Sequence, residues 1–289
     1  MPELPEVEVT RQGLLSWLPG RVITRIHWSG KRLRQPLPLA LLDSHILGNR
    51  IRTIDRRAKY LLIRMADAAV LLVHLGMTGK LGLFSPDTSV GPHDHLRLLL
   101  DDGRELRFND QRRFGSITVW PGQESPAREE ALNQNLGLEP LARDFTAQAL
   151  ADLAAGRRAA IKTLLMNSRL IAGIGNIYAN EILYGCRIHP ATRSSDLSLS
   201  QWRDLVHQTR IILERAISAG GSTISDFLNA SGRPGYFQLQ LAVYGKKGQP
   251  CPACSSEIEK IDLAGRATYF CPCCQRPPSS FGQPGSATR

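Results

Sequence analysis

Residues 251–274 read CPACSSEIEKIDLAGRATYFCPCC, and this stretch determines how the C-terminal part of the chain folds. It holds two Cys-x2-Cys pairs, Cys251/Cys254 and Cys271/Cys274. Each pair can turn two thiolates toward one ion, and four thiolates complete a tetrahedral coordination shell. The spacing therefore predicts one structural Zn2+ on a hairpin, with no coordination position left open for catalysis.

The remaining cysteines favour metal binding over disulfide bonding. Of the 6 cysteines, only Cys186 lies outside residues 251–274, whereas a disulfide framework would spread its cysteines along the chain. Cys273 competes with Cys274 as the fourth ligand, and the two-residue spacer favours Cys274. Cys186 fits a small buried residue of a helix. Arg266, between the two pairs, is either a solvated strand residue or a phosphate contact held by the zinc turn.

Upstream of the zinc module the chain changes from strands to helices. Short apolar runs separated by turn residues predict an antiparallel sandwich or barrel, as in KYLLIRM (59–65) and AVLLVHLGM (69–77). Residues 6–18 predict a helix before these strands. The later segments have helical periodicity, and the last long helix is expected to have Ser200 as its N-cap and to stop at Gly220.

The charge of the chain narrows the choice of partners. The 289 residues include 36 Lys+Arg against 26 Asp+Glu, a net charge of +10, and 42% hydrophobic residues exclude wholesale disorder. Such a protein binds a polyanion, either nucleic acid or an anionic membrane surface, or is simply basic. The acidic N-terminus is unlike a signal peptide and no apolar run is long enough to span a membrane, so a soluble cytosolic protein is expected.

The N-terminal sequence MPELPEVE carries groups suited to covalent chemistry. Removal of Met1 would leave Pro2 with a secondary amine, and a terminal amine of pKa about 8 is partly unprotonated at neutral pH. Such an amine can attack an aldehyde-like carbon, and Glu3 beside it can transfer protons. Alternatively, Pro5 begins a helix, and the glutamates, including Glu6, stabilise the N-terminal end of its dipole.

Ordered sequence blocks spread over residues 1–276 resemble the bacterial formamidopyrimidine-DNA glycosylases. Leu4, HLGM (74–77) and GRPGYF (232–237) distinguish this pattern from endonuclease VIII, the related family of pyrimidine-lesion enzymes. The blocks are MPELPEVE (1–8), RRAKYLL (56–62), HLGMTG (74–79), HDH (93–95), DQRRFG (110–115), LGLEPL (136–141), GIGNIYANE (173–181), GGSTISDF (220–227), GRPGYF (232–237), VYGKKGQPC (243–251) and GRATYFCPCCQ (265–275).

The resemblance implies an α+β fold: an N-terminal antiparallel β-sandwich with flanking helices, then a helix–two-turn–helix domain with a C-terminal four-cysteine zinc finger. It implies excision of oxidised purines such as 8-oxoguanine and formamidopyrimidines from damaged double-stranded DNA, followed by β,δ-elimination at the abasic site. Structural Zn2+ is the one expected cofactor. A monomer in the bacterial cytoplasm, nucleoid-associated through DNA binding, is expected.

The expected parts of the chain are a catalytic domain (1–135), a linker (136–148), a helix–two-turn–helix domain (149–240), a zinc finger (241–276) and a disordered tail (277–289).

Four residues match the catalytic positions of this family. Pro2 matches the nucleophile that forms a Schiff base with C1′, and Glu3 its acid/base partner. Lys59 matches the lysine of β-elimination, although a strand-end lysine can also cover apolar surface with its stem. Arg266 matches the zinc-finger arginine of δ-elimination, where a cation beside the 3′ phosphate would stabilise the developing charge.

Further positions match the DNA contacts of the family, namely His93, Arg112, Arg158, Lys162 and Asn176. Arg158 is the weakest match, because the family is Lys-rich there and this chain reads GRRAAIK; arginine still binds phosphate well. Without the resemblance, tandem arginines at 157–158 would be read as a solvated helix face.

Three residues match the wedge that fills the gap left by an extruded nucleotide: Met77, Arg112 and Phe114. Met77 alone would be read as a core residue. The glycine-rich stretch 220–236 matches the loop that covers the extruded lesion. Gln111 and Leu138 depart from family prolines, and Cys273 is extra, but none of these changes removes a catalytic group.

Two other functions stay open. One is an enzyme for pyrimidine lesions, like endonuclease VIII. The other is a non-catalytic zinc protein that binds DNA without specificity, which the charge and the four cysteines alone would permit. The presence of Pro2, Glu3, Lys59 and Arg266 together argues against the second, because a binding protein has no need of all four.

Overall fold

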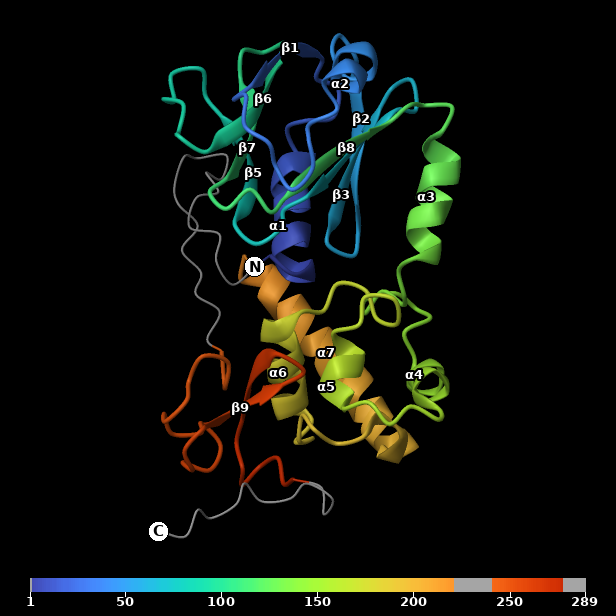
Figure 1. The fold of residues 1–289 in the computed structure, drawn as a ribbon, viewed down its shortest axis with the longest axis vertical. Helices are drawn as coiled ribbons and strands as arrows, with labels where there is room; N and C mark the ends of the chain where they lie inside the picture. The colour runs from blue at the N-terminus through green and yellow to red at the C-terminus, as the bar shows by residue number, and fades with distance from the viewer. Residues whose placement is uncertain (1, 221–240, 278–289) are drawn as a thin grey trace. The chain divides into compact units, whose positions relative to one another are not determined.

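The computed structural model describes residues 2–220 and 241–277. Met1, the predicted lesion-covering loop beyond Gly220 and the tail after residue 277 lie outside this part of the chain. The chain divides into two compact units, one formed by residues 1–135 with 216–239 and the other by residues 136–215 with 240–289 (Figure 1). Among the described helices, none is long and apolar enough to cross a membrane.

The first unit is a sandwich of two antiparallel four-stranded sheets. The short apolar runs left a sandwich or a barrel open, and the resemblance implied the sandwich. One sheet has the order β1-β6-β7-β5 and the other β2-β3-β4-β8. The strands are β1 (Ile23–Trp28), β2 (Ile51–Arg57), β3 (Tyr60–Met65), β4 (Val70–His74), β5 (Gly79–Phe84), β6 (Asp94–Leu100), β7 (Glu105–Asp110) and β8 (Ser116–Trp120).

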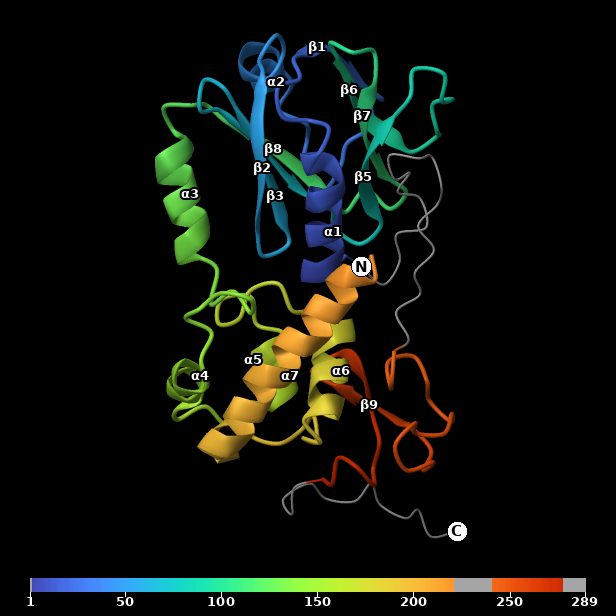
Figure 2. The same ribbon diagram turned by 180° about the vertical axis from the view of Figure 1, so that it is seen from behind.

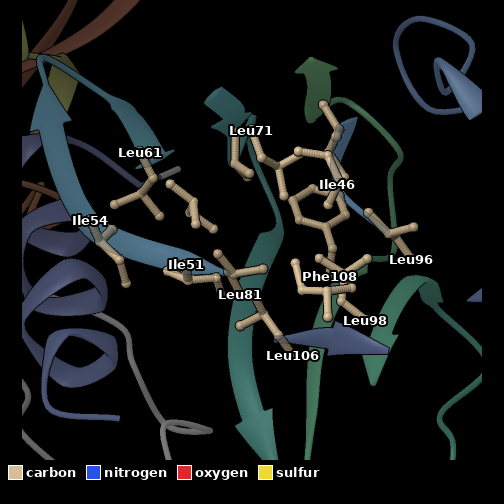
Figure 3. Packing of buried hydrophobic residues seen from close by; sticks show 14 of the residues in the cluster. Ile46, Ile51, Ile54, Leu61, Leu71, Leu81, Leu96, Leu98, Leu106 and Phe108 are labelled. Atoms are coloured by element: carbon tan, nitrogen blue, oxygen red, sulfur yellow. The ribbon is translucent and has the colours of Figure 1, made fainter. Parts of the chain in front are cut away.

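Apolar side chains from both sheets fill the space between them. The labelled residues in Figure 3 include Ile54 and Leu61 from one sheet and Leu98 and Phe108 from the other, all less than 3% exposed. Burial of this apolar surface is the main force that holds the two sheets together. The sandwich therefore supplies a rigid base for the turns at its ends.

Three helices flank this sandwich: α1 (Leu4–Leu15), α2 (Leu39–His45) and α3 (Ser125–Gln134). Helix α1 begins two residues earlier than the predicted range and contacts strands of both sheets, β2 and β3 of one and β5 of the other (Figures 1 and 2). Arg64 of β3 anchors α3 by donating two hydrogen bonds to the Glu129 carboxylate, at 2.9 and 2.7 Å. Its Nε also bonds Asp55 of β2 at 2.5 Å.

The second unit is helical and ends in a two-stranded hairpin. Its elements are α4 (Ala147–Ala154), α5 (Ile161–Leu165), α6 (Asn176–Gly185), the 3-10 helix η1 (Ser194–Asp196), α7 (Leu199–Ser218), β9 (Glu259–Leu263) and β10 (Arg266–Phe270). The observed architecture is the α+β fold expected from the sequence. The linker at residues 136–148, and the boundary at 240/241 between the helix–two-turn–helix domain and the zinc finger, stay proposals.

The start of α7 differs from the prediction. Ser198, not Ser200, caps the helix: its Oγ accepts from the Gln201 amide at 3.3 Å, and the Gln201 side chain accepts from the Ser198 amide at 2.9 Å. This reciprocal pair is a capping box, with glutamine at the third helical position. The sequence SLSQ offers two serines, and only the one three residues before the glutamine can form the pair.

Candidate functional site

The N-terminal segment places Pro2 and Glu3 directly before α1. Glu3 is the N-cap residue, and its backbone amide donates to Glu6 Oε2 at 2.8 Å, which closes a capping box. Glu3 and Glu6 are 1% and 2% exposed, whereas Pro2 is only half-buried. Glu3 and Glu6 therefore cap the helix, as the alternative interpretation holds. Glu3 is a buried carboxyl group next to the half-buried Pro2, and its role in proton transfer stays a prediction.

Helix α1 is tied to the strand that leads to Lys59. The Glu8 carboxylate accepts from Arg56 Nε at 2.9 Å and from Arg11 Nη2 at 2.7 Å. Burial would raise the pKa of Glu8, but the hydrogen bonds from Arg11 and Arg56 outweigh it, so the pKa lies below its usual value. Lys59 follows in the tight β2–β3 turn, where Ala58 has a positive φ of 52°.

His74 lies close to Lys59 and is a residue that the sequence analysis did not single out. Its ring packs against Tyr60 with 4.9 Å between centroids, and its Nδ1 accepts from the Gly76 amide at 3.1 Å. Burial lowers the pKa of His74 to about 4, with further contributions from the charges of Lys59 and Arg34. His74 is therefore neutral at physiological pH. In the sequence, His74 is marked only as the first residue of the HLGM block, and the block indicates no role for it.

The three predicted wedge residues lie on two neighbouring connections. Residues 75–78 lead from β4 to β5, and residues 111–115 lead from β7 to β8, so both cross between the sheets. In the ladders, His74 pairs with Ser116 and Gly79 with Asp110, which holds both ends of the two connections side by side. Sheet topology thus brings together residues that are far apart in sequence.

The wedge side chains are exposed at these connections. Met77 is 38% exposed and Phe114 43%, and the Arg112 guanidinium lies 4.8 Å from the centre of the Phe114 ring. Exposed large apolar side chains beside a cation are suited to insertion between bases. Met77 does not belong to the core, which was the alternative that its apolar character suggested.

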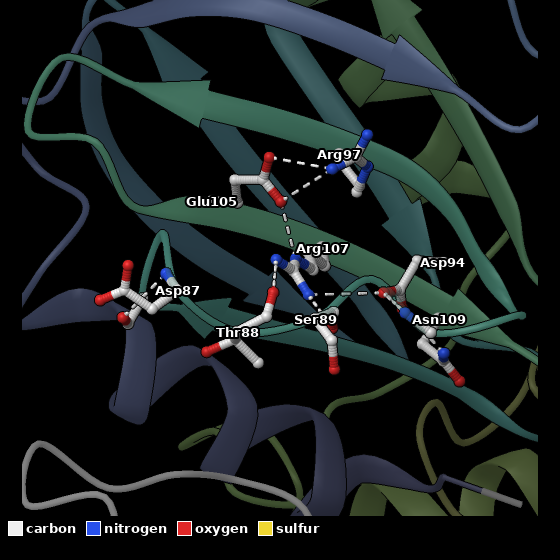
Figure 4. A network of polar contacts seen from close by, with 10 residues as sticks. Asp87, Thr88, Ser89, Asp94, Arg97, Glu105, Arg107 and Asn109 are labelled. Carbon is white, nitrogen blue, oxygen red and sulfur yellow. Dashed lines mark hydrogen bonds and ion pairs between the residues drawn. The ribbon is translucent and has the colours of Figure 1, made fainter.

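His93 is the last residue of the loop between β5 and β6. Figure 4 shows that a buried arginine bonds to Thr88 and Ser89 of this loop. Arg107 of β7 is 2% exposed and donates to Ser89 O at 2.9 Å and to Thr88 O at 2.7 Å. Its Nε also bonds Glu105 at 2.7 Å. Just beyond this loop, the Asp110 amide donates to His93 O at 3.0 Å. His93, half-buried, therefore lies beside the connection that carries Arg112 and Phe114.

In the second unit, Lys162 and Asn176 hold the hairpin strand β10. Lys162 is 1% exposed, and its Nζ donates to Ala267 O at 3.1 Å and to Thr268 Oγ1 at 2.6 Å. Asn176 Nδ2 also donates to Ala267 O, at 3.0 Å, while its buried Oδ1 has no hydrogen-bond partner within the described residues. That Lys162 and Asn176 contact phosphate stays a prediction. In the structure, both side chains hydrogen-bond the strand that begins at Arg266.

Arg158 and Arg266 are exposed. Arg158 lies between α4 and α5, so the tandem arginines do not form a helix face as the alternative interpretation supposed. Arg266 is the first residue of β10, directly after a turn in which Ala264 and Gly265 have φ of 52° and 71°. A solvated strand residue and a phosphate contact both remain compatible with this position.

The metal site is formed by the four predicted cysteines. The Sγ atoms of Cys251, Cys254, Cys271 and Cys274 all lie within 4.8 Å of one another, and Cys273 is exposed and outside the group. The amides of Ala253 and Cys274 each donate to a ligand sulfur at 3.4 Å, which favours the thiolate form. This donor set is suited to one structural Zn2+.

Buried polar side chains that the sequence analysis missed attach the zinc module to α6. The Glu181 carboxylate accepts from three successive amides, Ala242, Val243 and Tyr244, at 2.7 to 3.0 Å. Gln275, fully buried, accepts from the Cys271 amide at 3.0 Å and donates to Ile188 O at 2.8 Å. No periodicity or spacing marks these residues, because their partners are backbone groups far away in sequence.

We expect Glu181→Gln to lower the free energy of unfolding by about 2 kcal/mol, because the amides of Ala242, Val243 and Tyr244 share the two carboxylate oxygens and the amide side chain offers them only one. The measurement is urea denaturation of the zinc-loaded protein. Glu214→Gln, at an exposed position of α7, is the matched control and should change stability by less than about 0.5 kcal/mol. Equal stability of the two variants would contradict the anchoring role.

Comparisons with known proteins agree with this geometry. Three family models match in chain order: "Formamidopyrimidine-DNA glycosylase N-terminal domain" at residues 1–117, "Formamidopyrimidine-DNA glycosylase H2TH domain" at 136–228 and "Zinc finger found in FPG and IleRS" at 248–277. Curated relatives named formamidopyrimidine-DNA glycosylase include those of Halorhodospira halophila, 44% identical, and Laribacter hongkongensis, 45% identical. Each match covers 96% of this chain and 100% of the relative.

Solved structures give the same result. The wild-type Lactococcus lactis enzyme in complex with DNA containing N7-benzyl-Fapy-dG is 35% identical and superposes with a TM-score of 0.86. Its complex with DNA containing an oxidised pyrimidine gives 33% identity and a TM-score of 0.84. Both matches cover 96% of this chain and 100% of the other. The chain therefore belongs to the formamidopyrimidine-DNA glycosylase family.

Proposed function

We propose that this protein is a base excision repair enzyme that removes oxidised purines, such as 8-oxoguanine and formamidopyrimidines, from duplex DNA and then cleaves the strand. Family membership supports glycosylase activity on damaged DNA, and the relatives' complexes contain lesion or abasic-site DNA. The observation that carries the proposal is the half-buried Pro2 next to the buried carboxyl group of Glu3. We further propose that it acts in the bacterial cytoplasm, at the nucleoid.

The first chemical step would be attack on the sugar. After removal of Met1, the Pro2 nitrogen forms a bond to C1′ while the glycosidic bond breaks and the base leaves with a proton. Glu3, in its acid form, protonates the ring oxygen as the sugar opens, which leaves an iminium ion between Pro2 and C1′.

Strand cleavage would follow by two eliminations. Loss of a proton from C2′ and of the 3′ phosphate breaks the C3′–O bond. Loss of a proton from C4′ and of the 5′ phosphate then breaks the C5′–O bond. We assign Lys59 to the first elimination and Arg266 to the second, where a cation stabilises the charge of the departing phosphate. The zinc ion takes no part in these steps, because its four cysteine ligands fill its coordination shell.

DNA binding would combine phosphate contacts with a wedge. His93, Arg158, Lys162 and Asn176 are the proposed phosphate contacts, and Met77, Arg112 and Phe114 the residues that take the place of the extruded nucleotide. An enzyme that reacts at C1′ of a paired nucleotide must move that nucleotide out of the stack. We propose that the exposed side chains of Met77 and Phe114 fill the gap that it leaves.

The test is covalent trapping. The mass of the purified chain shows whether Met1 is absent, and borohydride reduces the iminium ion to a stable protein–DNA crosslink. We expect crosslinks with an 8-oxoguanine duplex to form faster than with a thymine glycol duplex. A processed, zinc-loaded sample that crosslinks to neither 8-oxoguanine nor abasic DNA would refute the mechanism, and preference for thymine glycol would favour the endonuclease VIII-like alternative.

Phosphate contacts also predict a strong dependence on salt. Binding to an abasic-analogue duplex should weaken at least about tenfold between about 50 and about 200 mM salt, because each neutralised phosphate releases counterions. Arg158→Gln should make the slope of log affinity against log salt shallower by about one unit. Arg203→Gln, at an exposed position of α7, serves as control and should leave the slope unchanged. Affinity independent of salt would contradict the phosphate assignments.

A further inference from the structure

Asp110, at the end of β7, is a fully buried carboxylate located between the two connections that carry the wedge. Its Oδ1 accepts from Thr78 Oγ1 at 2.5 Å, and its Oδ2 accepts from the Gly115 amide at 2.8 Å. Thr78 follows Met77, and Gly115 follows Phe114. One carboxylate therefore bonds to the residue directly after each apolar wedge residue, with one oxygen for each connection.

Thr78 extends this link to the third wedge residue. While its hydroxyl donates to Asp110, the same Oγ1 accepts from the Arg112 amide at 3.1 Å. The Asp110 carbonyl also accepts from the Arg113 amide at 3.2 Å, which shapes the turn in which Arg113 has a φ of 56°. The hydroxyl can donate and accept at once, so it couples the 75–78 connection to the backbone of the 111–115 connection.

Close packing of the two connections leaves little room for independent movement. A Cβ added to Gly76, whose φ is 65°, would lie 2.4 Å from the Phe114 carbonyl carbon. A Cβ on Gly115 would lie 2.6 Å from the Phe108 ring and 2.9 Å from His74 O. Backbone contacts this close require glycine. The glycines bring the connections together, and Asp110 with Thr78 bonds them in one register.

We propose that Asp110 and Thr78 are positioning residues of the wedge, which hold Met77, Arg112 and Phe114 in one rigid constellation before DNA binds. The wedge side chains are exposed and must displace a stacked nucleotide. If they become ordered only on insertion, the entropy they lose reduces the free energy available for extruding that nucleotide. A buried carboxylate with two short hydrogen bonds keeps this cost low. The inference rests on the proposed function for what the wedge does, but the link between the connections is a property of the protein alone.

The link is tested first without DNA. Thr78→Val keeps the shape of the side chain but removes both hydrogen bonds of the hydroxyl, and Thr78→Ser restores them. We expect Thr78→Val to speed amide hydrogen exchange in residues 110–116 at least about tenfold, and Thr78→Ser to leave it near the wild-type rate. Thr24→Val is the matched control, since Thr24 is exposed on β1 and bonds only outside this region, to Leu99 O at 3.2 Å. Unchanged exchange in Thr78→Val overturns the link.

The role in extrusion is tested with two DNA substrates. Thr78→Val should slow single-turnover excision from an 8-oxoguanine duplex at least about tenfold, yet change borohydride trapping on a single-stranded abasic oligonucleotide by less than about twofold, because that substrate has no stacked base pair to open. Thr78→Ser should recover duplex excision. Full activity of Thr78→Val on the duplex, or an equal loss on both substrates, overturns the positioning role. If the wild type traps neither substrate, the proposed function fails, and the exchange experiment still decides whether the link exists.

Discussion

Pro2→Gly lowers borohydride trapping on an 8-oxoguanine duplex at least about a hundredfold, if Pro2 is the nucleophile. Glycine is small enough for Met1 still to be removed, so the variant also exposes a terminal amine, but a primary one. A secondary amine yields an iminium ion that carries its charge without a removable N–H proton, which stabilises the intermediate that both eliminations need. The loss should therefore appear in the chemical step.

Binding separates this outcome from a folding defect. Pro2 lies before the first residue of α1 and outside the capping hydrogen bond between Glu3 and Glu6, so affinity for an abasic-analogue duplex should change less than about threefold. Pro19→Gly, in the exposed turn after α1, is the matched control and should trap like the wild type. Trapping by Pro2→Gly at the wild-type rate would contradict the need for the secondary amine of Pro2, and Lys59 would be the next residue to replace.

The parts of the fold that follow from local rules were predictable from the sequence. Cysteine spacing gave the ligand set Cys251, Cys254, Cys271 and Cys274, because a four-thiolate site requires two tight knuckles. Alternation of apolar runs and turns indicated antiparallel strands in a sandwich or a barrel, because each strand must bury one face, and the resemblance indicated the sandwich. Even the choice between Ser198 and Ser200 could have been made, since the glutamine three residues after Ser198 completes a capping box.

What the sequence could not show depends on contacts between distant segments. The burial of Lys162 follows from the packing of α5 and α6 against β10, and lysine is ordinarily read as a surface residue. Likewise, Asp110 and Thr78 meet only because β4 pairs with β8 and β5 with β7. The resemblance placed individual residues at catalytic and wedge positions, but it carried no information on the groups that hold them there.

We expect Cys271→Ser to reduce bound zinc from one per chain to almost none and to lower strand cleavage at an abasic site at least about a hundredfold. Cys271 is fully buried, and its sulfur lies 3.4 Å from that of Cys254. Structural zinc contributes about 10–16 kcal/mol of apparent binding free energy to small modules of this kind, far more than one hairpin can replace. Without the ion, residues 251–274 should lose their fold.

The effect should reach Arg266 through the hairpin itself. Strand β10 is bonded by Lys162, Asn176 and the side chain of Asn180, which accepts from the Tyr269 amide at 2.8 Å. These bonds need the strand to be formed, and Arg266 is its first residue. Zinc loss should therefore remove the cation of the second elimination, so the product of the first elimination accumulates in whatever activity remains.

Cys273→Ser is the matched control for this prediction, because Cys273 is two residues away, exposed and outside the ligand group. It should keep one zinc per chain and wild-type cleavage. Metal content is measured by mass spectrometry of the purified variants, and products are resolved on a denaturing gel. Loss of zinc in Cys273→Ser would mean that Cys273 takes the place of Cys274 as the fourth ligand, and that the two-residue spacer does not govern this site. Retention of zinc in Cys271→Ser would contradict the four-cysteine ligand set itself. Retention of full cleavage in a zinc-free protein would instead separate the hairpin from the chemistry and return Arg266 to the role of a solvated strand residue.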